Sequence, residues 1–278
     1  MLRIFKATRA RTLLSNAISD WVNSIAILAT STQDYYRAVI SDFAKTVPDV
    51  AVEKLTIGTI RAYLSTIVLK GKKSTANKYL RVIKSFCRFL EENYGIDNPT
   101  RYLRQFKLNP SVRHFLTKEE YLKLLSACKT KREHDIITLL ANTGLRASEL
   151  CSLTWDSVEP QLTRITVVGK GSKMRIVPLN ESCRKVLSTY PRGTRLYFSK
   201  NRHSLYQTCR AIGDRANIPL NPHSLRHYFA TMLLQSGVRG GIKTVSLLLG
   251  HASVELTEKT YIHYTGDFLD CVTDCLDS

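Results

Sequence analysis

The sequence predicts a mainly helical protein of two domains, with one small β-hairpin in the second domain. Apolar residues recur at three- and four-residue spacing along most of the 278 residues, which is the period of amphipathic helices. Residues 164–179 instead hold two β-branched runs around a glycine-containing turn, which predicts a hairpin. A polar, basic stretch over residues 99–115 is typical of a linker. We therefore expect a helical domain over residues 1–98 and a mixed α/β domain over 116–278.

In the first domain, the clearest predicted helix covers residues 74–94, after two others at 32–46 and 56–69. Asn98-Pro99 then closes the domain, because a residue before proline avoids the α region. Seven residues at helical spacing form the apolar face of the 74–94 helix: Ala76, Tyr79, Leu80, Ile83, Phe86, Cys87 and Leu90.

Basic residues occupy the other face of this helix, and two lysines precede it. A charged face exposed to water is the common alternative. The net charge of the chain and the motifs described below favour contact with nucleic-acid phosphates. The residues of this basic stripe are Lys72, Lys73, Lys78, Arg81, Lys84 and Arg88.

Lysine and arginine outnumber aspartate and glutamate by 41 to 23, which gives a formal net charge of +18. An excess this large favours a polyanionic partner over a merely basic protein. No apolar run is long enough to span a bilayer, so we expect no membrane partner. The seven cysteines form no C-x-x-C pair, and we expect neither a metal site nor disulfides, but reduced thiols in the cytoplasm.

The second domain opens with a capping box at Thr117 and is predicted to be helical on both sides of the hairpin. Gly144 is a suitable end for the second of its helices. Asn221-Pro222 is a sound start for a later one. The predicted helices after the capping box cover residues 133–143, 146–153, 181–189, 204–216, 222–236 and 242–249, with one more that carries Tyr261.

Several short motifs of this domain are weak when taken singly. Arg146 and Glu149 could be a simple helix ion pair, and Lys170 could be an ordinary turn residue. His223 and Arg226 share one helix face, but such a pair is more often a surface feature. The order of the motifs along the chain is more informative: R-x-x-E, strand-G-K-G-strand, H-x-x-R-H, L-G-H and Y-x-H-Y.

In this order the motifs resemble the catalytic domain of the tyrosine recombinases, the phage-integrase and Xer-type family. The resemblance runs from about residue 117 to the end, and the first hundred residues look like the helical, SAM-like core-binding domain of that family. It implies a two-domain recombinase architecture. The catalytic residues that it implies are Arg146, Lys170, His223, Arg226, His251 and Tyr261.

The resemblance also implies a role for each residue. Tyr261 would attack the phosphorus and form a 3′-phosphotyrosyl link, while Arg146 and Arg226 hold the non-bridging oxygens. Lys170 would protonate the leaving 5′ oxygen. His223 would assist proton transfer at the tyrosine. The remaining matched residues are His251, which would bind a phosphate oxygen, and Glu149, which would hold its neighbours in place. His227 lies about 100° round the helix from Arg226, which favours a structural or supporting role for it.

These roles agree with the chemistry of the side chains. A phosphodiester under attack gathers negative charge, which fixed guanidinium groups stabilise. A tyrosine with a pKa of about 10 is mostly neutral at pH 7 and needs a base or a positive field. A phosphotyrosyl bond conserves the energy of the broken ester, so we expect no ATP, no metal and no other cofactor.

One spacing departs from the family pattern. The tyrosine usually follows the L-G-H histidine by nine residues, whereas Tyr261 follows His251 by ten. Tyr264 is therefore the alternative nucleophile. The acidic, amphipathic stretch after Thr265 could be a stray terminal helix, or an element that docks on a neighbouring protomer.

The sequence thus predicts a site-specific recombinase or integrase that cuts and rejoins double-stranded DNA. We expect it to work as a homo-oligomer, a tetramer in the synaptic complex. We expect it in the cytoplasm and associated with the nucleoid, in the host cell if the protein is viral or plasmid-encoded. A host resolvase and a mobile-element or viral integrase are both compatible with this sequence. Two alternatives remain open: a non-catalytic DNA-binding protein on a recombinase scaffold, and a type IB-like topoisomerase.

Overall fold

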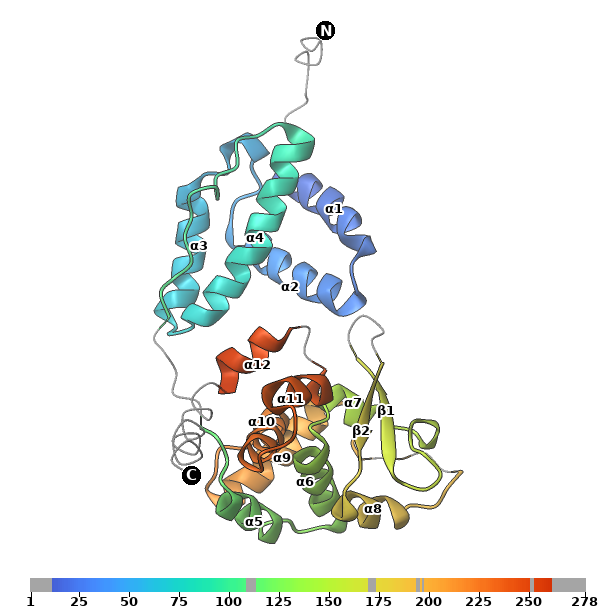
Figure 1. The fold of residues 1–278 in the computed structure, drawn as a ribbon. Coiled ribbons are helices and arrows are strands. Elements are labelled where there is room, and N and C mark those ends of the chain that lie inside the picture. The colour runs from blue at the N-terminus through green and yellow to red at the C-terminus, as the bar shows by residue number, and fades with distance from the viewer. Residues whose placement is uncertain are drawn as a thin grey trace, which may run out of the picture. The chain divides into compact units, whose positions relative to one another are not determined.

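The computed structural model describes residues 12–108, 114–169, 174–193, 196, 198–250 and 253–261. The chain divides into two compact units between residues 111 and 112 (Figure 1). The predicted fold class is confirmed: the described residues are mostly helical, with one two-stranded sheet. No helix in the described part of the chain is both long enough and apolar enough to cross a membrane.

In its described residues, 12–108, the first unit is a bundle of four helices. Its core is rich in aromatic side chains, with Trp21, Phe43 and Phe86 fully buried. Trp21 meets the edge of Phe86 and stacks on Tyr36, so α1, α2 and α4 share one core. The helices are α1 (Leu14–Ser24), α2 (Thr30–Thr46), α3 (Ile57–Leu69) and α4 (Lys73–Tyr94), with two short 3-10 helices at Ile25–Ile27 and Val52–Lys54.

Helix α4 has the amphipathic character that its sequence predicts. Six of its seven predicted apolar residues are buried, and Tyr79 is half-buried. Five residues of the basic stripe are exposed, and Lys84 is half-buried. The helix ends at Tyr94 because Gly95 takes the left-handed conformation, at φ 63°.

The second unit packs helices around α6, with a hairpin of β1 and β2 beside them (Figure 1). The strands are antiparallel, and Val167 of β1 pairs with Arg175 of β2. Before the hairpin lie α5 (Lys118–Ser126), α6 (Lys131–Thr143), α7 (Ala147–Cys151) and a 3-10 turn at Trp155–Ser157. The later elements are β1 (Arg164–Val168), β2 (Met174–Pro178), α8 (Glu181–Ser188), α9 (Arg202–Ala216), α10 (Pro222–Gln235), α11 (Gly241–Leu249) and α12 (Val254–Tyr261).

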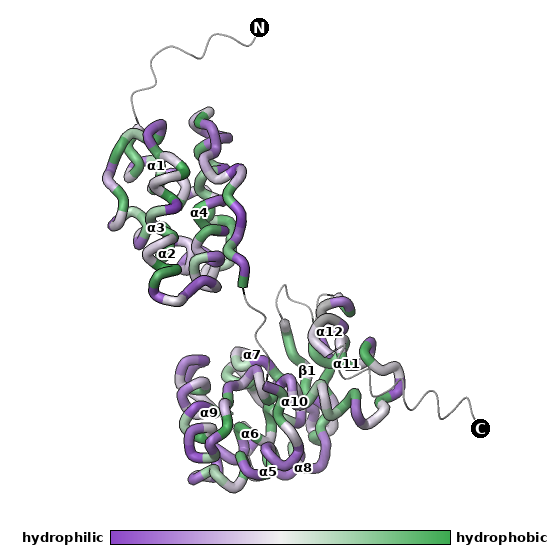
Figure 2. The backbone as a smooth tube through the Cα atoms, turned by 90° about the vertical axis from the view of Figure 1, so that its left-hand side faces the viewer, coloured by the Kyte–Doolittle hydropathy of each residue, from purple (hydrophilic) through white to green (hydrophobic). Residues whose placement is uncertain are grey.

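Helix α6 is the centre of this unit, and α10 packs along it. Hydrophobic and hydrophilic residues alternate within single helices of both units, as expected for helices that bury only one face (Figure 2). Gly144 ends α6 at φ 61°, and an added Cβ there would lie 2.5 Å from Phe229 Cδ1 of α10. A side chain at this position would therefore separate α6 from α10.

The two helix starts predicted from capping residues are present: Thr117 and Glu120 form the capping box of α5, and Asn221 caps α10. The helix expected from residue 133 begins earlier, at Lys131, after the cap Thr130. The side chain of Asn221 accepts from the backbone N–H groups of His223 and Ser224 at 2.9 and 3.0 Å. These two bonds fix the first turn of α10, which carries His223 and Arg226.

Candidate active site

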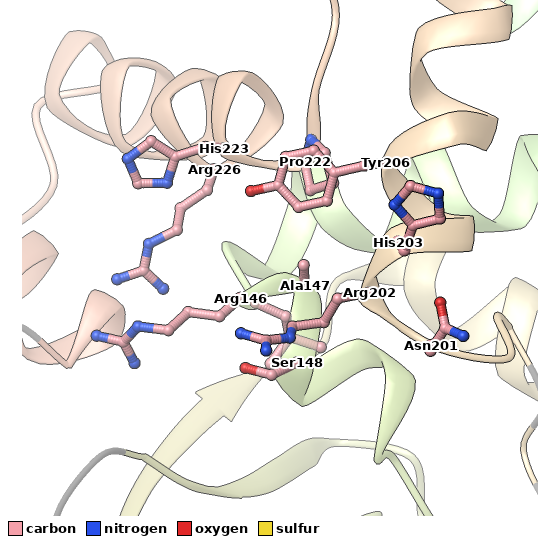
Figure 3. A pocket seen from close by; sticks show the side chains of 11 residues that line it. Arg146, Ala147, Ser148, Asn201, Arg202, His203, Tyr206, Pro222, His223 and Arg226 are labelled. Atoms are coloured by element: carbon pink, nitrogen blue, oxygen red, sulfur yellow. The ribbon is translucent and has the colours of Figure 1, made fainter. Parts of the chain in front are cut away.

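A cavity of about 930 Å³ opens in the second unit beside α7, α9 and α10. Its residues come from three separate stretches of the chain. Figure 3 shows the guanidinium groups of Arg146 and Arg226 pointing toward the same side of this cavity, with His223 next to them. The lining residues are Leu145, Arg146, Ala147, Ser148, Asn201, Arg202, His203, Tyr206, Pro222, His223 and Arg226.

Arg146 precedes the first turn of α7, and both its backbone N–H and its guanidinium group donate hydrogen bonds within the protein. Its backbone N–H donates to Glu149 Oε2 at 2.6 Å, and its Nη1 donates to Glu149 Oε1 at 2.9 Å. Its Nη2 donates to the carbonyl oxygen of Gly250 at 2.7 Å. The side chain remains 34% exposed, so the guanidinium is oriented by the protein and still accessible from the cavity.

Arg226, from α10, is only 2% exposed. Its Nη1 donates to the carbonyl oxygen of Gly144 at 2.7 Å, and its Nη2 donates to that of Leu249 at 2.5 Å. Burial, followed by the nearby positive charges of Arg146 and Arg175, lowers the pKa of Arg226 to about 9. Among the described residues this cation forms no ion pair with a carboxylate, and an anion in the cavity would compensate its charge.

Arg175, on β2, is a third arginine of this cluster, and sequence reasoning missed it. Its Nη1 and Nη2 donate to the two oxygens of Glu149 at 2.7 and 2.8 Å, and its Nε donates to the carbonyl oxygen of Leu248 at 2.8 Å. The side chain is 8% exposed. The only available signal was the alternation of strand β2, which does not reveal a pairing with a carboxylate of α7.

Three successive carbonyls at the carboxyl end of α11 thus receive three arginines. Leu248 accepts from Arg175, Leu249 accepts from Arg226, and Gly250 accepts from Arg146. The unpaired carbonyls at the end of a helix carry partial negative charge. This helix end therefore offsets the mutual repulsion of the three guanidinium groups and holds them together.

Glu149 completes the cluster. It is 7% exposed and accepts from both Arg146 and Arg175. Burial alone raises the pKa of this carboxyl, but the hydrogen bonds from Arg175 and from the Arg146 backbone and the charge of Arg175 outweigh burial and lower it to about 2. Glu149 is therefore a carboxylate at any physiological pH.

The tyrosine hydroxyl is bound by a histidine of α10. Tyr261 Oη lies 2.6 Å from His227 Nδ1, and the His227 ring meets the edge of His223 at a centroid distance of 4.4 Å. The sequence analysis assigned proton transfer at Tyr261 to His223 and gave His227 only a supporting role. In this structure the direct contact is with His227, and His223 touches His227.

Tyr261 is 1% exposed and, although described, does not line the cavity. Its ring belongs to a small apolar cluster with Phe229, Val245 and Leu249. The ring of Phe115 lies 6.2 Å away, between centroids. The structure therefore holds this hydroxyl inside the protein and not in the cavity that carries Arg146 and Arg226.

Lys170, His251 and Tyr264 lie outside the described residues. The basic stripe belongs to the first unit. Among the residues that the structure describes, no three metal-ligating side chains come together. The described site thus consists of Arg146 and Arg226 at a cavity, with Glu149 and Arg175 behind them, and of a tyrosine that is hydrogen-bonded to a histidine.

Residues 114–266 match the phage integrase family. The chain therefore belongs to that family, and it is an enzyme of the tyrosine recombinase class, as the motifs predicted. A similar relative is the tyrosine recombinase XerC of Thermodesulfovibrio yellowstonii. The two sequences are 30% identical over 280 residues, which cover 88% of this chain and 91% of the relative.

Solved structures share the fold. A crystal structure of a lambda integrase dimer bound to a COC′ core site has a TM-score of 0.75 at 20% identity, over 89% of this chain and 95% of that one. A lambda integrase tetramer bound to a Holliday junction has a TM-score of 0.73 at 20% identity, over 87% and 78% of the two chains.

Proposed function

We propose that this protein cleaves and rejoins double-stranded DNA at specific sites, with Tyr261 as the nucleophile. The observation that carries the proposal is the convergence of Arg146 and Arg226, 80 residues apart in sequence, on one cavity and on one helix end. Both guanidinium groups are held in place before any ligand binds. A phosphate in the cavity would accept hydrogen bonds from both.

The chemistry is a transesterification. The Tyr261 oxygen forms a bond to phosphorus as the bond from phosphorus to the 5′ oxygen breaks, so a phosphodiester replaces a phosphodiester. The tyrosine proton passes to a base, and the 5′ oxygen takes up a proton. Arg146 and Arg226 stabilise the charge that develops on the non-bridging oxygens, because they are oriented in advance by Glu149 and by the end of α11.

Cleavage requires Tyr261 to leave its apolar cluster. The present contact with His227 keeps the hydroxyl hydrogen-bonded while it is buried. Either ring nitrogen of His227 can accept a proton, and the ring of His223 lies against it. We assign proton transfer from the tyrosine to this histidine pair. Lys170 as the acid for the 5′ oxygen and His251 as a further phosphate ligand complete the proposed site.

We further propose that three consecutive segments of the chain have different roles. Residues 1–98 would be the DNA-binding core domain, 99–115 a basic linker and 116–278 the catalytic domain. The basic stripe would contact DNA phosphates, which supply most of the binding energy and make it salt-dependent. Exposure of five of its six residues supports this assignment.

The protein would act as a tetramer on two duplexes. The lambda integrase tetramer bound to a Holliday junction shares this fold and supports the assignment. Its relative in Thermodesulfovibrio yellowstonii is a tyrosine recombinase, and we place this protein in the cytoplasm, with the DNA on which it would act.

A nicked duplex tests the proposed chemistry. The protein first selects its own site from a pool of random duplexes. A nick is then placed close to each phosphate of that site in turn. Cleavage at a phosphate beside the nick releases a short fragment with a 5′-hydroxyl, which diffuses away, so that the strand cannot be rejoined. We expect a covalent protein–DNA adduct that survives denaturation. Binding without an adduct would instead support a non-catalytic DNA-binding protein. Relaxation of any supercoiled plasmid, whatever its sequence, would support a topoisomerase.

A further inference from the structure

We propose that Arg175 is a positioning residue, which holds Arg146 and the carboxyl end of α11 in the arrangement that grips a phosphate. The proposal rests on the proposed function, because it assigns to Arg146 and Arg226 the binding of the scissile phosphate. No motif of the sequence singled out Arg175, and it does not line the cavity.

The contacts of Arg175 indicate that it acts through other groups. Each of its three guanidinium nitrogens donates to an acceptor inside the protein, two to Glu149 and one to the carbonyl of Leu248. With 8% of the side chain exposed, it is unsuited to bind DNA directly. Its planar fork matches the two oxygens of a carboxylate, which fixes the orientation of Glu149.

Glu149 transmits this orientation to Arg146. Oxygen Oε1 of Glu149 accepts from Nη1 of both Arg175 and Arg146. Oxygen Oε2 accepts from Arg175 Nη2 and from the backbone N–H of Arg146. Two of the four hydrogen bonds to this carboxylate therefore come from Arg175. Without them, Glu149 is free to turn, and the guanidinium of Arg146 loses its fixed support.

A second route runs through α11. Arg175 Nε fixes the Leu248 carbonyl, and the next two carbonyls hold Arg226 and Arg146. The contact is close, because a Cβ on Gly250 would lie 2.9 Å from Arg175 Cδ. Arg175 thus joins strand β2, helix α7 and the end of α11 at one point. Strand β2 also begins shortly after Lys170 in the sequence.

Arg175→Met tests the proposal, because methionine keeps most of the length and removes the fork and the charge. The substrate is the nicked duplex carrying the site selected by the wild-type protein. We expect the first-order rate of adduct formation at saturating protein to fall roughly 10- to 100-fold, since a small displacement of a positioned group costs this much. The dissociation constant for the same duplex should change less than about threefold, because phosphate contacts elsewhere dominate affinity.

The pH dependence separates positioning from a general loss of structure. In Arg175→Met, Glu149 stays buried but loses the hydrogen bonds and the positive charge of Arg175, which do most to lower its pKa. The pKa of Glu149 therefore rises in this variant. Protonation then removes its hydrogen bond to Arg146 Nη1. We expect the ratio of variant to wild-type rate to fall further as the pH drops from about 7 to about 5. A purely structural defect would leave this ratio independent of pH.

Two further variants complete the test. Arg175→Lys keeps the charge beside Glu149 and should recover part of the rate, with a ratio that no longer depends on pH. Arg164→Met is the matched control, because Arg164 lies on β1 of the same hairpin and faces Glu159 at 3.6 Å, but is 56% exposed. It should leave the rate unchanged.

The outcomes are distinct. If the wild-type protein forms no adduct, the proposed function is wrong, and the positioning role of Arg175, which rests on it, is overturned as well. If the wild type reacts and Arg175→Met reacts as fast, or loses affinity in step with rate, the positioning role is wrong. Should Arg175→Met fail to fold by thermal unfolding, Arg175→Lys decides: a loss of roughly tenfold in rate supports the proposal, and an unchanged rate overturns it.

Discussion

Glu149 is the residue on which the arginine cluster depends. It is the carboxylate that Arg146 and Arg175 share, and it is almost completely buried. Removing one partner from a buried ion pair leaves an uncompensated charge, which is far more costly than losing a surface pair. A motif of R-x-x-E can therefore look like a helix ion pair in the sequence and still have a central structural role.

We expect Glu149→Gln to lower the free energy of unfolding at pH 7 by about 3 kcal/mol, because it leaves Arg175 buried without its carboxylate. The effect has a defined pH window. The pKa of Glu149 in the folded protein, about 2, lies below its ordinary value of 4.5. The stabilisation is therefore complete above about pH 4.5 and is lost as the pH falls toward about 2.

Urea unfolding at a series of pH values checks this prediction. The difference between wild type and variant should be largest at neutral pH and should shrink below about pH 4.5. A difference that is constant across the whole range would show that the charge of Glu149 is not what stabilises the fold.

Some of these site residues could be predicted from the sequence, and others could not. The motifs indicated Arg146, Arg226 and Glu149, because each lies in a short pattern of recognisable order. Arg175 was missed, because its carboxylate partner lies 26 residues earlier on another element and only folding joins them. The hydrogen bond between Tyr261 and His227 was missed for the same reason: it joins α12 to α10 across 34 residues.

Among the elements, α11 contributes most to the arrangement of the site, because the carbonyls at its carboxyl end accept hydrogen bonds from all three arginines. Gly250 ends it at φ 63° with the left-handed conformation that glycine adopts most readily. The same residue lies against Arg175. Two physical requirements thus explain the glycine of the L-G-H motif. The backbone turns with a positive φ at this position, and the close approach of Arg175 leaves no room for a side chain.

Gly250→Ala should therefore be more damaging than an ordinary glycine substitution. An alanine in the left-handed region costs about 1–2 kcal/mol. The contact with Arg175 should add roughly 1–3 kcal/mol and displace the cluster. Gly193→Ala is the matched control, because φ is +79° there and no atom lies within 4 Å of the added Cβ. Equal losses of unfolding free energy for both variants would contradict this account of Gly250.

The elements themselves were predicted well where their periodicity was long. Helix α4 and the hairpin follow from apolar spacing and turn residues. Helix α1 was not predicted, although Leu14, Ala17 and Trp21 are buried at helical spacing. It has 11 residues and lacks a side-chain cap at its start, so its sequence gives no clear boundary.

At the scale of the whole molecule, charge is the property that most affects binding. The net charge of +18 draws the protein to DNA, but only residues that contact phosphates release counterions on binding. The basic stripe on α4 is our candidate for such contacts. The double variant Lys78→Gln, Arg81→Gln should weaken binding and reduce the slope of log affinity against log salt by about 2.

Arg37→Gln, Lys45→Gln is the control for this prediction. Both residues are exposed on α2 of the same unit, outside the basic stripe, and the change in net charge is the same. Titration of the selected duplex over a range of salt concentrations gives the slopes. If the two double variants reduce the slope equally, net charge alone accounts for the effect, and the stripe has no special role.

The central claim is that Tyr261 attacks a phosphate held by Arg146 and Arg226. The most direct measurement is mass spectrometry of the peptide that remains attached to DNA after reaction with the nicked duplex. We predict that the modified residue is Tyr261, that Tyr261→Phe forms no adduct, and that Tyr264→Phe still does. An adduct on Tyr264, or one that persists in Tyr261→Phe, would contradict the account.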